Sequence, residues 1–214
     1  MDFVAIDLER ANSQPRSSCA IGITPVKNGL IGETIYRLIR PPELEFDDFQ
    51  IRMHGITAND VKDAPTLDQL WPEIAPQLIG TLVIAHSAAS ADMPMLKQSL
   101  QAVGVPVPAI SFLCSRDLSR ELWPKPNPPN HKLKTLCKFH SIPLKHHDAG
   151  SDARAAAQLI LLGFKERGVL TSVENGGAGR PNLVALDRFV GNSVGQGNWS
   201  QFKDSGVLRR RSVV

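Results

Sequence analysis

The stretch Phe3-Val4-Ala5-Ile6-Asp7-Leu8-Glu9 sets both the fold and the chemistry expected of this chain. Its first four residues are apolar, which is typical of a strand covered on both faces of a sheet. Asp7 and Glu9 stand two residues apart, so on an extended backbone they project to the same side. Two carboxylates held together at the end of a buried strand repel each other, and Mg²⁺ or Mn²⁺ would relieve that repulsion. Taken alone, Asp-x-Glu is also compatible with a solvated strand end.

The segments that follow predict two more strands and then a mixture of helices and strands. Residues 19–26 and 30–39 flank Asn28-Gly29, a signal for a tight hairpin turn, so the first three strands should form an antiparallel meander. Apolar residues at helical spacing predict the remaining helices, which alternate with two short apolar strands. The helices are predicted at 66–78, 92–103, 117–122, 132–139 and 151–167, and the strands at 81–85 and 110–114. This order predicts an α/β fold, a mixed five-stranded sheet with helices on both faces.

The composition indicates a globular chain with one substantial domain. The sequence has 214 residues, of which 42% are hydrophobic and 21% charged, and it lacks an apolar run long enough to cross a membrane. Asp2 and the absence of a basic stretch at the N-terminus favour a strand over a signal peptide. Cys19, Cys114 and Cys137 form no C-x-x-C pair, so neither a disulfide framework nor a cysteine zinc site is expected. A reducing cytoplasm fits this cysteine usage best.

Residues 168–214 differ in character from the rest of the chain. Residues 1–167 contain as many basic as acidic residues, so the whole net charge of +3 lies in this C-terminal part. It is rich in glycine and loses the apolar periodicity, which predicts a flexible or partner-bound extension with one short ordered stretch at 183–190. As an alternative, the three arginines at 209–211 would add salt-sensitive contacts to phosphates.

A second acidic residue of interest, Asp92, follows a loop of small residues. The strand predicted at 81–85 leads into His86 and then into Ser87-Ala88-Ala89-Ser90-Ala91, after which Asp92 begins a helix. An acid at this place is also favoured by the helix dipole, so simple capping is an alternative to a site role. We expect His86 to be a hydrogen-bonded histidine buried at the strand end and not a metal ligand.

A third motif contains His147 and Asp152, five residues apart across a loop-to-helix junction. A histidine on a loop can move toward a reacting water, whereas an aspartate in the first helical turn stays in place. This division suits a general base and a metal ligand. His-x4-Asp also occurs in acyltransferases that esterify glycerol phosphates, but that interpretation leaves Asp7, Glu9 and Asp92 unexplained.

In this order, the three motifs resemble the DEDDh family of 3′→5′ exonucleases, which includes polymerase proofreading subunits, ribonuclease T and oligoribonuclease. Residues 53–57 (Met-His-Gly-Ile-Thr) and 131–133 (His-Lys-Leu) are also similar to family segments. The resemblance covers residues 1–167, which are therefore expected to form an exonuclease domain of the ribonuclease H-like fold. It implies that Asp7, Glu9, Asp92, His147 and Asp152 converge on one active site.

The sequence departs from the family pattern at two places. The family usually has Thr after the glutamate of its first motif, whereas this chain has Arg10. One extra residue separates His86 from Asp92, and Ala91 replaces the common Phe. Because Met93 and the apolar residues after it keep the helical phase, we place the insertion in the loop and retain Asp92.

The resemblance implies a mechanism with two divalent cations. Asp7 would bridge both cations, Glu9 and Asp152 would complete one site, and Asp92 would support the other. His147 would take the proton from the attacking water, which releases nucleoside 5′-monophosphates from single-stranded or frayed 3′ ends of DNA or RNA. A DNA polymerase or a repair protein is the partner that the family suggests. The alternative, motivated by the two departures, is a catalytically impaired nucleic-acid-binding protein of the same fold.

Overall fold

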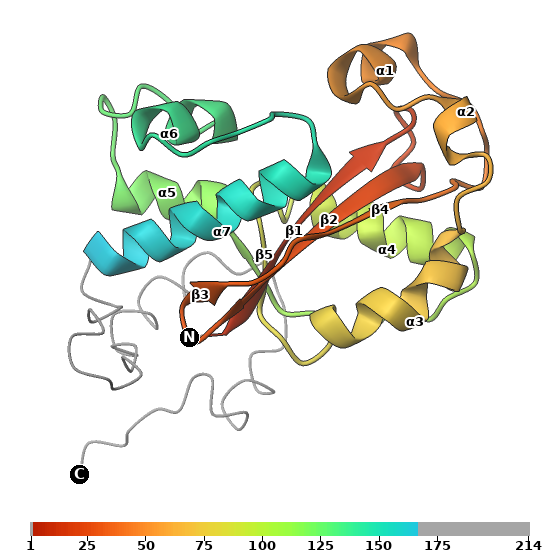
Figure 1. The fold of residues 1–214 in the computed structure, drawn as a ribbon, viewed down its shortest axis with the longest axis horizontal. Helices are drawn as coiled ribbons and strands as arrows, with labels where there is room; N and C mark the ends of the chain where they lie inside the picture. The colour runs from red at the N-terminus through yellow and green to blue at the C-terminus, as the bar shows by residue number, and fades with distance from the viewer. Residues whose placement is uncertain (1, 167–214) are drawn as a thin grey trace.

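A computed structural model describes residues 2–166 of the chain (Figure 1). These residues form a mixed sheet with helices packed against it, as the sequence pattern predicts. The extension predicted at 168–214 and its ordered stretch lie outside the described residues. None of the helices within 2–166 is long and apolar enough to cross a membrane.

Six strands make up the sheet in this part of the chain, so the α/β prediction is confirmed with one strand more than expected. The strands are β1 (Phe3–Arg10), β2 (Ser18–Lys27), β3 (Leu30–Ile31), β4 (Ile35–Leu38), β5 (Val83–Ala85) and β6 (Phe112–Cys114). β1 is central, antiparallel to β2 and parallel to β5, and β6 continues the sheet in parallel beyond β5. β3 and β4 both pair with β2 in antiparallel orientation, which confirms the predicted meander.

The additional strand arises because the strand predicted at 30–39 is interrupted. The Gly32 N–H donates to the Pro25 carbonyl at 2.8 Å, and regular pairing with β2 resumes only at the start of β4. The preceding turn has the predicted geometry, with φ angles of 53° at Asn28 and 76° at Gly29. The sequence therefore predicted the turn correctly and missed the break in the strand that follows it.

Seven helices occur within residues 2–166, and the sequence pattern predicts five of them. The helices are α1 (Asp48–His54), α2 (Ala58–Val61), α3 (Leu67–Leu78), α4 (Asp92–Ala102), α5 (Ser115–Leu122), α6 (Leu133–Phe139) and α7 (Ala149–Glu166). The predicted bounds of α3 to α7 are correct to within two residues. The sequence pattern missed α1 and α2 because seven and four residues contain too few turns to show an apolar repeat.

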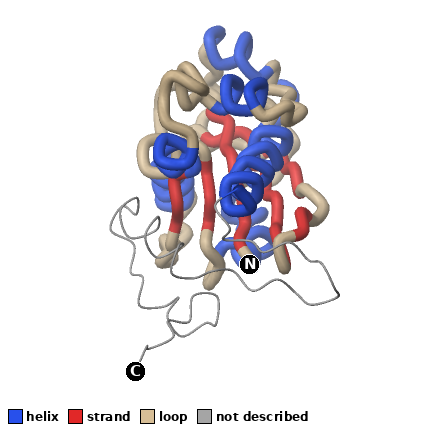
Figure 2. The backbone as a smooth tube through the Cα atoms, turned by 90° about the vertical axis from the view of Figure 1, so that its left-hand side faces the viewer, coloured by secondary structure: helices blue, strands red, loops and turns tan. Residues whose placement is uncertain are grey.

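The sheet separates two apolar cores because successive residues of β1 point to opposite faces. Phe3 and Ala5 pack with α5, α6 and α7, whereas Val4, Ile6 and Leu8 pack with α3 and α4. Helices therefore cover both sides of the sheet (Figures 1 and 2). This two-sided burial is the reason why β1 is apolar at consecutive positions.

Candidate active site

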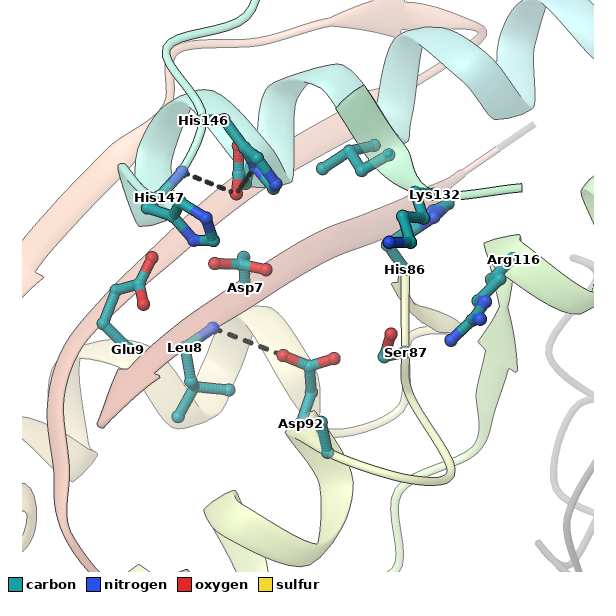
Figure 3. Close-up of a pocket in the computed structure, with 13 residues that line it drawn as sticks. Asp7, Leu8, Glu9, His86, Ser87, Asp92, Arg116, Lys132, His146 and His147 are labelled. Atoms are coloured by element: carbon teal, nitrogen blue, oxygen red, sulfur yellow. Dashed lines mark hydrogen bonds and ion pairs between the residues drawn. The ribbon is translucent and has the colours of Figure 1, made fainter. Parts of the chain in front are cut away.

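A pocket with a volume of about 290 Å³ lies where β1 ends and α7 begins (Figure 3). Its lining comprises Asp7, Leu8, Glu9, His86, Ser87, Ala91, Asp92, Arg116, Lys132, Leu133, His146, His147 and Asp152. All five residues that the sequence predicts as site residues are in this set. The structure thus brings together side chains from β1, the start of α4 and the start of α7.

β1 supplies the first two carboxylates, and β2 leaves room for the helix that faces them. Asp7 and Glu9 occupy alternate positions of β1 and so share the face that packs against α7. Gly22 lies opposite Asp7 in the antiparallel register. A Cβ atom at Gly22 would collide with the carbonyl group of Ala149, in the first turn of α7. The missing side chain at Gly22 therefore allows the start of α7 to approach the end of β1.

Asp152, in the first turn of α7, completes a group of three carboxylates. Asp7, Glu9 and Asp152 each offer one ligand atom, and these atoms all lie within 4.8 Å of one another. The Oδ2 atom of Asp152 accepts hydrogen bonds from the backbone N–H of His147 (3.1 Å) and from Nδ1 of His146 (3.0 Å). Its Oδ1 atom is buried and has no hydrogen-bond partner within residues 2–166. A buried carboxylate oxygen in this position is unfavourable unless a group from outside the described residues contacts it.

Burial and mutual repulsion raise the pKa values of these acids. The pKa of Asp7 is raised well above its usual value by burial and then by the charges of Asp92 and Glu9. Burial raises the pKa of Glu9 to about 8, and the charges of Asp152 and Asp92 add to this effect. Burial also raises the pKa of Asp152. Such acids ionise together only when positive charge compensates them, and all-oxygen ligands suit hard divalent cations. The donor set therefore fits a divalent cation.

Asp92 is the first residue of α4 and comes from the opposite face of the sheet. It is 4% exposed, and its Oδ1 atom accepts a hydrogen bond from the Leu8 N–H at 3.3 Å. This bond ties Asp92 to β1 between the two acids of that strand, so Asp92 does more than cap its own helix. Burial raises the pKa of Asp92 to about 6, whereas backbone hydrogen bonds, that from Leu8 first, lower it. The extra residue of the preceding loop is accommodated in a turn in which the Ala91 N–H donates to the Ser87 carbonyl.

His147 enters the pocket from the loop before α7. Its φ angle is 67°, an uncommon conformation for a residue with a side chain. Its ring stacks on that of His146, with the ring centroids 3.9 Å apart. Burial lowers the pKa of His147, and the charges of His146, His54 and Lys134 lower it further. The imidazole is therefore neutral near pH 7 and can accept a proton.

His86 has the structural position that the sequence predicts. It is 8% exposed, and its ring bonds to Ser115 Oγ through Nδ1 and to the His131 carbonyl through Nε2, both at 3.0 Å. Because a carbonyl oxygen only accepts, Nε2 carries the hydrogen and Nδ1 accepts from the Ser115 hydroxyl. Burial lowers the pKa of His86 to about 4. The prediction of a buried, hydrogen-bonded histidine is confirmed.

Three polar residues of the pocket do not follow from the sequence motifs. His146 adjoins His147 in the chain, and only the backbone conformation decides which of the two bonds to Asp152 through its ring. Arg116 belongs to α5 and Lys132 directly precedes α6. No spacing rule connects Arg116 with the acidic motifs. Lys132 belongs to the His-Lys-Leu segment that resembles the family, but that resemblance did not assign it a role in the site.

The fold and the pocket together define a class of protein. A central strand that ends in two carboxylates, beside a helix that supplies a third, is the arrangement expected of a ribonuclease H-like nuclease. Residues 4–160 match the model of a family described as Exonuclease. The chain therefore belongs to this exonuclease family.

Two relatives with similar sequences are much longer proteins than this chain. DNA polymerase III of the PolC type from Caldanaerobacter subterraneus subsp. tengcongensis is 29% identical over 163 residues, which are 75% of this chain and 11% of the polymerase. The 3′-5′ exonuclease DinG from Staphylococcus aureus is 25% identical over 167 residues, 77% of this chain and 18% of DinG. The chain thus spans only a small part of the length of either relative.

A solved structure supports the fold. The nuclease domain of 3′hExo, described as a DEDDh family member bound to rAMP, has a TM-score of 0.64 and 16% sequence identity. The similarity covers 77% of this chain and 92% of that one. Together with the family match, this similarity confirms the predicted relationship to the DEDDh exonucleases of the ribonuclease H-like superfamily. The roles of the five individual residues stay predictions.

Proposed function

We propose that this protein is a 3′→5′ exonuclease that hydrolyses the terminal phosphodiester bond of DNA or RNA and releases nucleoside 5′-monophosphates. The observation that carries this proposal is the group of Asp7, Glu9 and Asp152, whose ligand atoms lie within 4.8 Å of one another. Asp92 and His147 line the same pocket. Membership of the exonuclease family supports nuclease chemistry, and a relative named as a 3′-5′ exonuclease supports the direction.

Divalent cations, Mg²⁺ or Mn²⁺, are the cofactors that this donor set suits best. Asp7, Glu9 and Asp152 would hold these cations directly, and Asp92, which lines the same pocket, would support them. The buried Oδ1 atom of Asp152 supports this assignment, because it lacks a hydrogen-bond partner among the described residues. When bound, the cations stabilise the negative charge on the attacking and leaving oxygens.

His147 is the general base in this proposal. Its neutral imidazole accepts a proton from the attacking water, whose oxygen then forms a bond to the phosphorus. The bond between the phosphorus and the 3′ oxygen of the preceding nucleotide breaks, and that oxygen takes up a proton. The Asp152 carboxylate accepts from the His147 N–H and so holds the loop in place. His146, stacked on the ring of His147, restricts the motion of that ring.

The substrate in this proposal is a single-stranded or frayed 3′ end. Both DNA and RNA are included, because one relative is a DNA polymerase and one structural neighbour was solved with rAMP. The PolC relative also supports a DNA polymerase or repair partner. Residues 1–167 form the exonuclease domain of the proposal and 168–214 an extension to it, a division that the family match over residues 4–160 supports.

Cleavage of labelled single strands tests the proposal. With Mn²⁺ or Mg²⁺, a 3′-labelled oligonucleotide should release labelled mononucleotide at once, and a 5′-labelled one should yield a ladder of shortened products. Asp152→Asn, which keeps the size of the side chain and removes its charge, should abolish both. Full-length strands that persist at excess enzyme, in DNA and RNA alike, would refute the proposal. Binding to the strands without cleavage would favour the catalytically impaired alternative.

The role of His147 has its own test. His147→Ala should slow cleavage by about 10²- to 10⁴-fold, the usual contribution of general acid–base catalysis, while oligonucleotide affinity changes little. His140→Ala removes a histidine outside the pocket and serves as the matched control. In the wild-type protein, kcat should fall at acidic pH, below a pKa that is lower than 6.5, and this limb should be missing in His147→Ala. Equal rates in the His147→Ala variant and the wild type would remove the assigned role.

A further inference from the structure

One side of the pocket is basic, and the proposed chemistry does not use it. Arg116 lies in the first turn of α5, and Lys132 directly precedes α6. In Figure 3 both side chains lie on the side of the pocket away from Glu9 and His147. The pocket thus has an acidic end and a basic end, and a ligand that fills it must suit both.

Within residues 2–166, Arg116 has no anionic partner that would neutralise it. Among the residues that the structure describes, no ion pair involves Arg116, and its Nε atom is buried without a hydrogen-bond partner. The next residue, Asp117, is paired with Arg120 at 2.7 Å. Because a half-buried guanidinium without a counter-charge is unfavourable, an anion from outside these residues is the expected partner.

A buried histidine connects the two segments that carry the basic residues. His86 accepts from the hydroxyl of Ser115, the neighbour of Arg116, and donates to the carbonyl of His131, the neighbour of Lys132. Both ring nitrogens of His86 are thereby used, so this histidine does not contact a ligand itself. The positive charge at this end comes from Arg116 and Lys132, and the packing around His86 determines where both stand.

We propose that Arg116 and Lys132 form a subsite for a phosphate group that flanks the phosphodiester bond being cleaved. Guanidinium and ammonium groups bind phosphate oxygens through charge-assisted hydrogen bonds. The acidic end receives the scissile phosphate, and the basic end receives the neighbouring phosphate of the same strand. The preferred substrate is therefore an oligonucleotide with at least two charged phosphates. This inference rests on the proposed exonuclease function and names its substrate class.

Binding measurements test the subsite without turnover. Fluorescence anisotropy would compare the full chain and its variants with Mg²⁺ and a short single strand that has a cleavage-resistant terminal linkage. Arg116→Gln and Lys132→Gln should each weaken binding by about 10- to 100-fold. Each should also reduce the slope of log affinity against log salt by about 0.7, the value for one lost phosphate contact on a single strand.

A neutral linkage identifies the phosphate that is bound. A methylphosphonate in place of the flanking phosphodiester should weaken binding by the wild type, and Arg116→Gln should then cause little further loss. Lys138→Gln removes a basic residue of α6 that lies outside the pocket, and it should behave like the wild type. The subsite would be overturned if Arg116→Gln lost the same affinity for the charged and the neutral strand, or lost affinity for neither. If Arg116→Gln fails to fold, Lys132→Gln, which removes the other positive charge of the subsite, takes its place in the same comparison.

Cleavage measured in parallel separates this inference from the proposed function. Binding that depends on Arg116 and on the flanking charge, without any cleavage by the wild type, would support the subsite and refute the exonuclease. If the wild type cleaves the strand but the variants lose equal affinity for charged and neutral linkages, the exonuclease is supported and the subsite is refuted. A wild type that binds no strand would refute both.

Discussion

Glu9→Gln is expected to stabilise the cation-free protein at alkaline pH. In the folded state, burial and the neighbouring carboxylates raise the pKa of Glu9 from 4.5 to about 8. Between these values the folded protein holds a proton that the unfolded chain releases. The contribution of protonated Glu9 to the free energy of unfolding is therefore fully present below pH 4.5, and it decreases as the pH rises toward 8. Glutamine has a similar size and carries no charge at any pH, so the substitution removes this loss.

The size of the effect follows from the width of that pH interval. For one such group, the free energy of unfolding falls by about 1.4 kcal/mol per pH unit. From pH 4.5 to half-ionisation near pH 8, the loss amounts to about 4 kcal/mol. Glu9 is only 9% exposed, so solvent does not screen much of this effect. We therefore expect Glu9→Gln to raise the free energy of unfolding by about 4 kcal/mol at pH 8 and by less than about 0.5 kcal/mol at pH 4.

Urea unfolding between pH 4 and pH 8 in the presence of EDTA measures this difference. Glu33→Gln, which changes an exposed glutamate between β3 and β4, is the control and should shift the free energy of unfolding by less than about 0.5 kcal/mol. Added Mn²⁺ at pH 8 should stabilise the wild type more than Glu9→Gln, because the cation compensates the charge that the variant lacks. Parallel pH profiles of the wild type and Glu9→Gln in EDTA would refute the reasoning.

Four further substitutions examine the site and its support. Gly22→Ala should lower the free energy of unfolding by about 1–3 kcal/mol, because the new methyl group forces α7 away from β2; an unchanged urea midpoint would contradict the close approach. Asp152→Asn should remove most of the Mn²⁺-induced rise in melting temperature, and a full rise in calorimetry would exclude this residue as a ligand. Thr66→Ala should reduce stability by about 1 kcal/mol in urea through loss of the capping box of α3, with cleavage at the wild-type rate. Phe164→Ala empties a fully buried position and should reduce stability by about 3–5 kcal/mol, and a smaller loss would show that the core around α7 collapses to fill the space.

Local patterns predicted most of the fold because they contain the relevant physical information. The unbroken apolar run before Asp7 indicated a strand covered on both faces, and Asn28-Gly29 indicated the tight turn that follows β2. The capping position Thr66 and the apolar repeat behind it located α3 to within one residue. The break near Gly32 could not be predicted, because it depends on a backbone hydrogen bond to Pro25 in the neighbouring strand.

The sequence by itself determined which site residues within each motif lie close together. Asp7 and Glu9 do so because side chains alternate along a strand, and His147 and Asp152 are close because only a short loop-to-helix junction separates them. Only the tertiary structure decided that Asp92 reaches the same pocket, through a hydrogen bond to a residue 84 positions away. It also decided that the pocket has a basic end, formed by Arg116 and Lys132, to which the sequence motifs assign no role. The physical reason is that strand and helix periods fix the directions of neighbouring side chains, whereas the distance between remote segments depends on how the helices pack against the sheet.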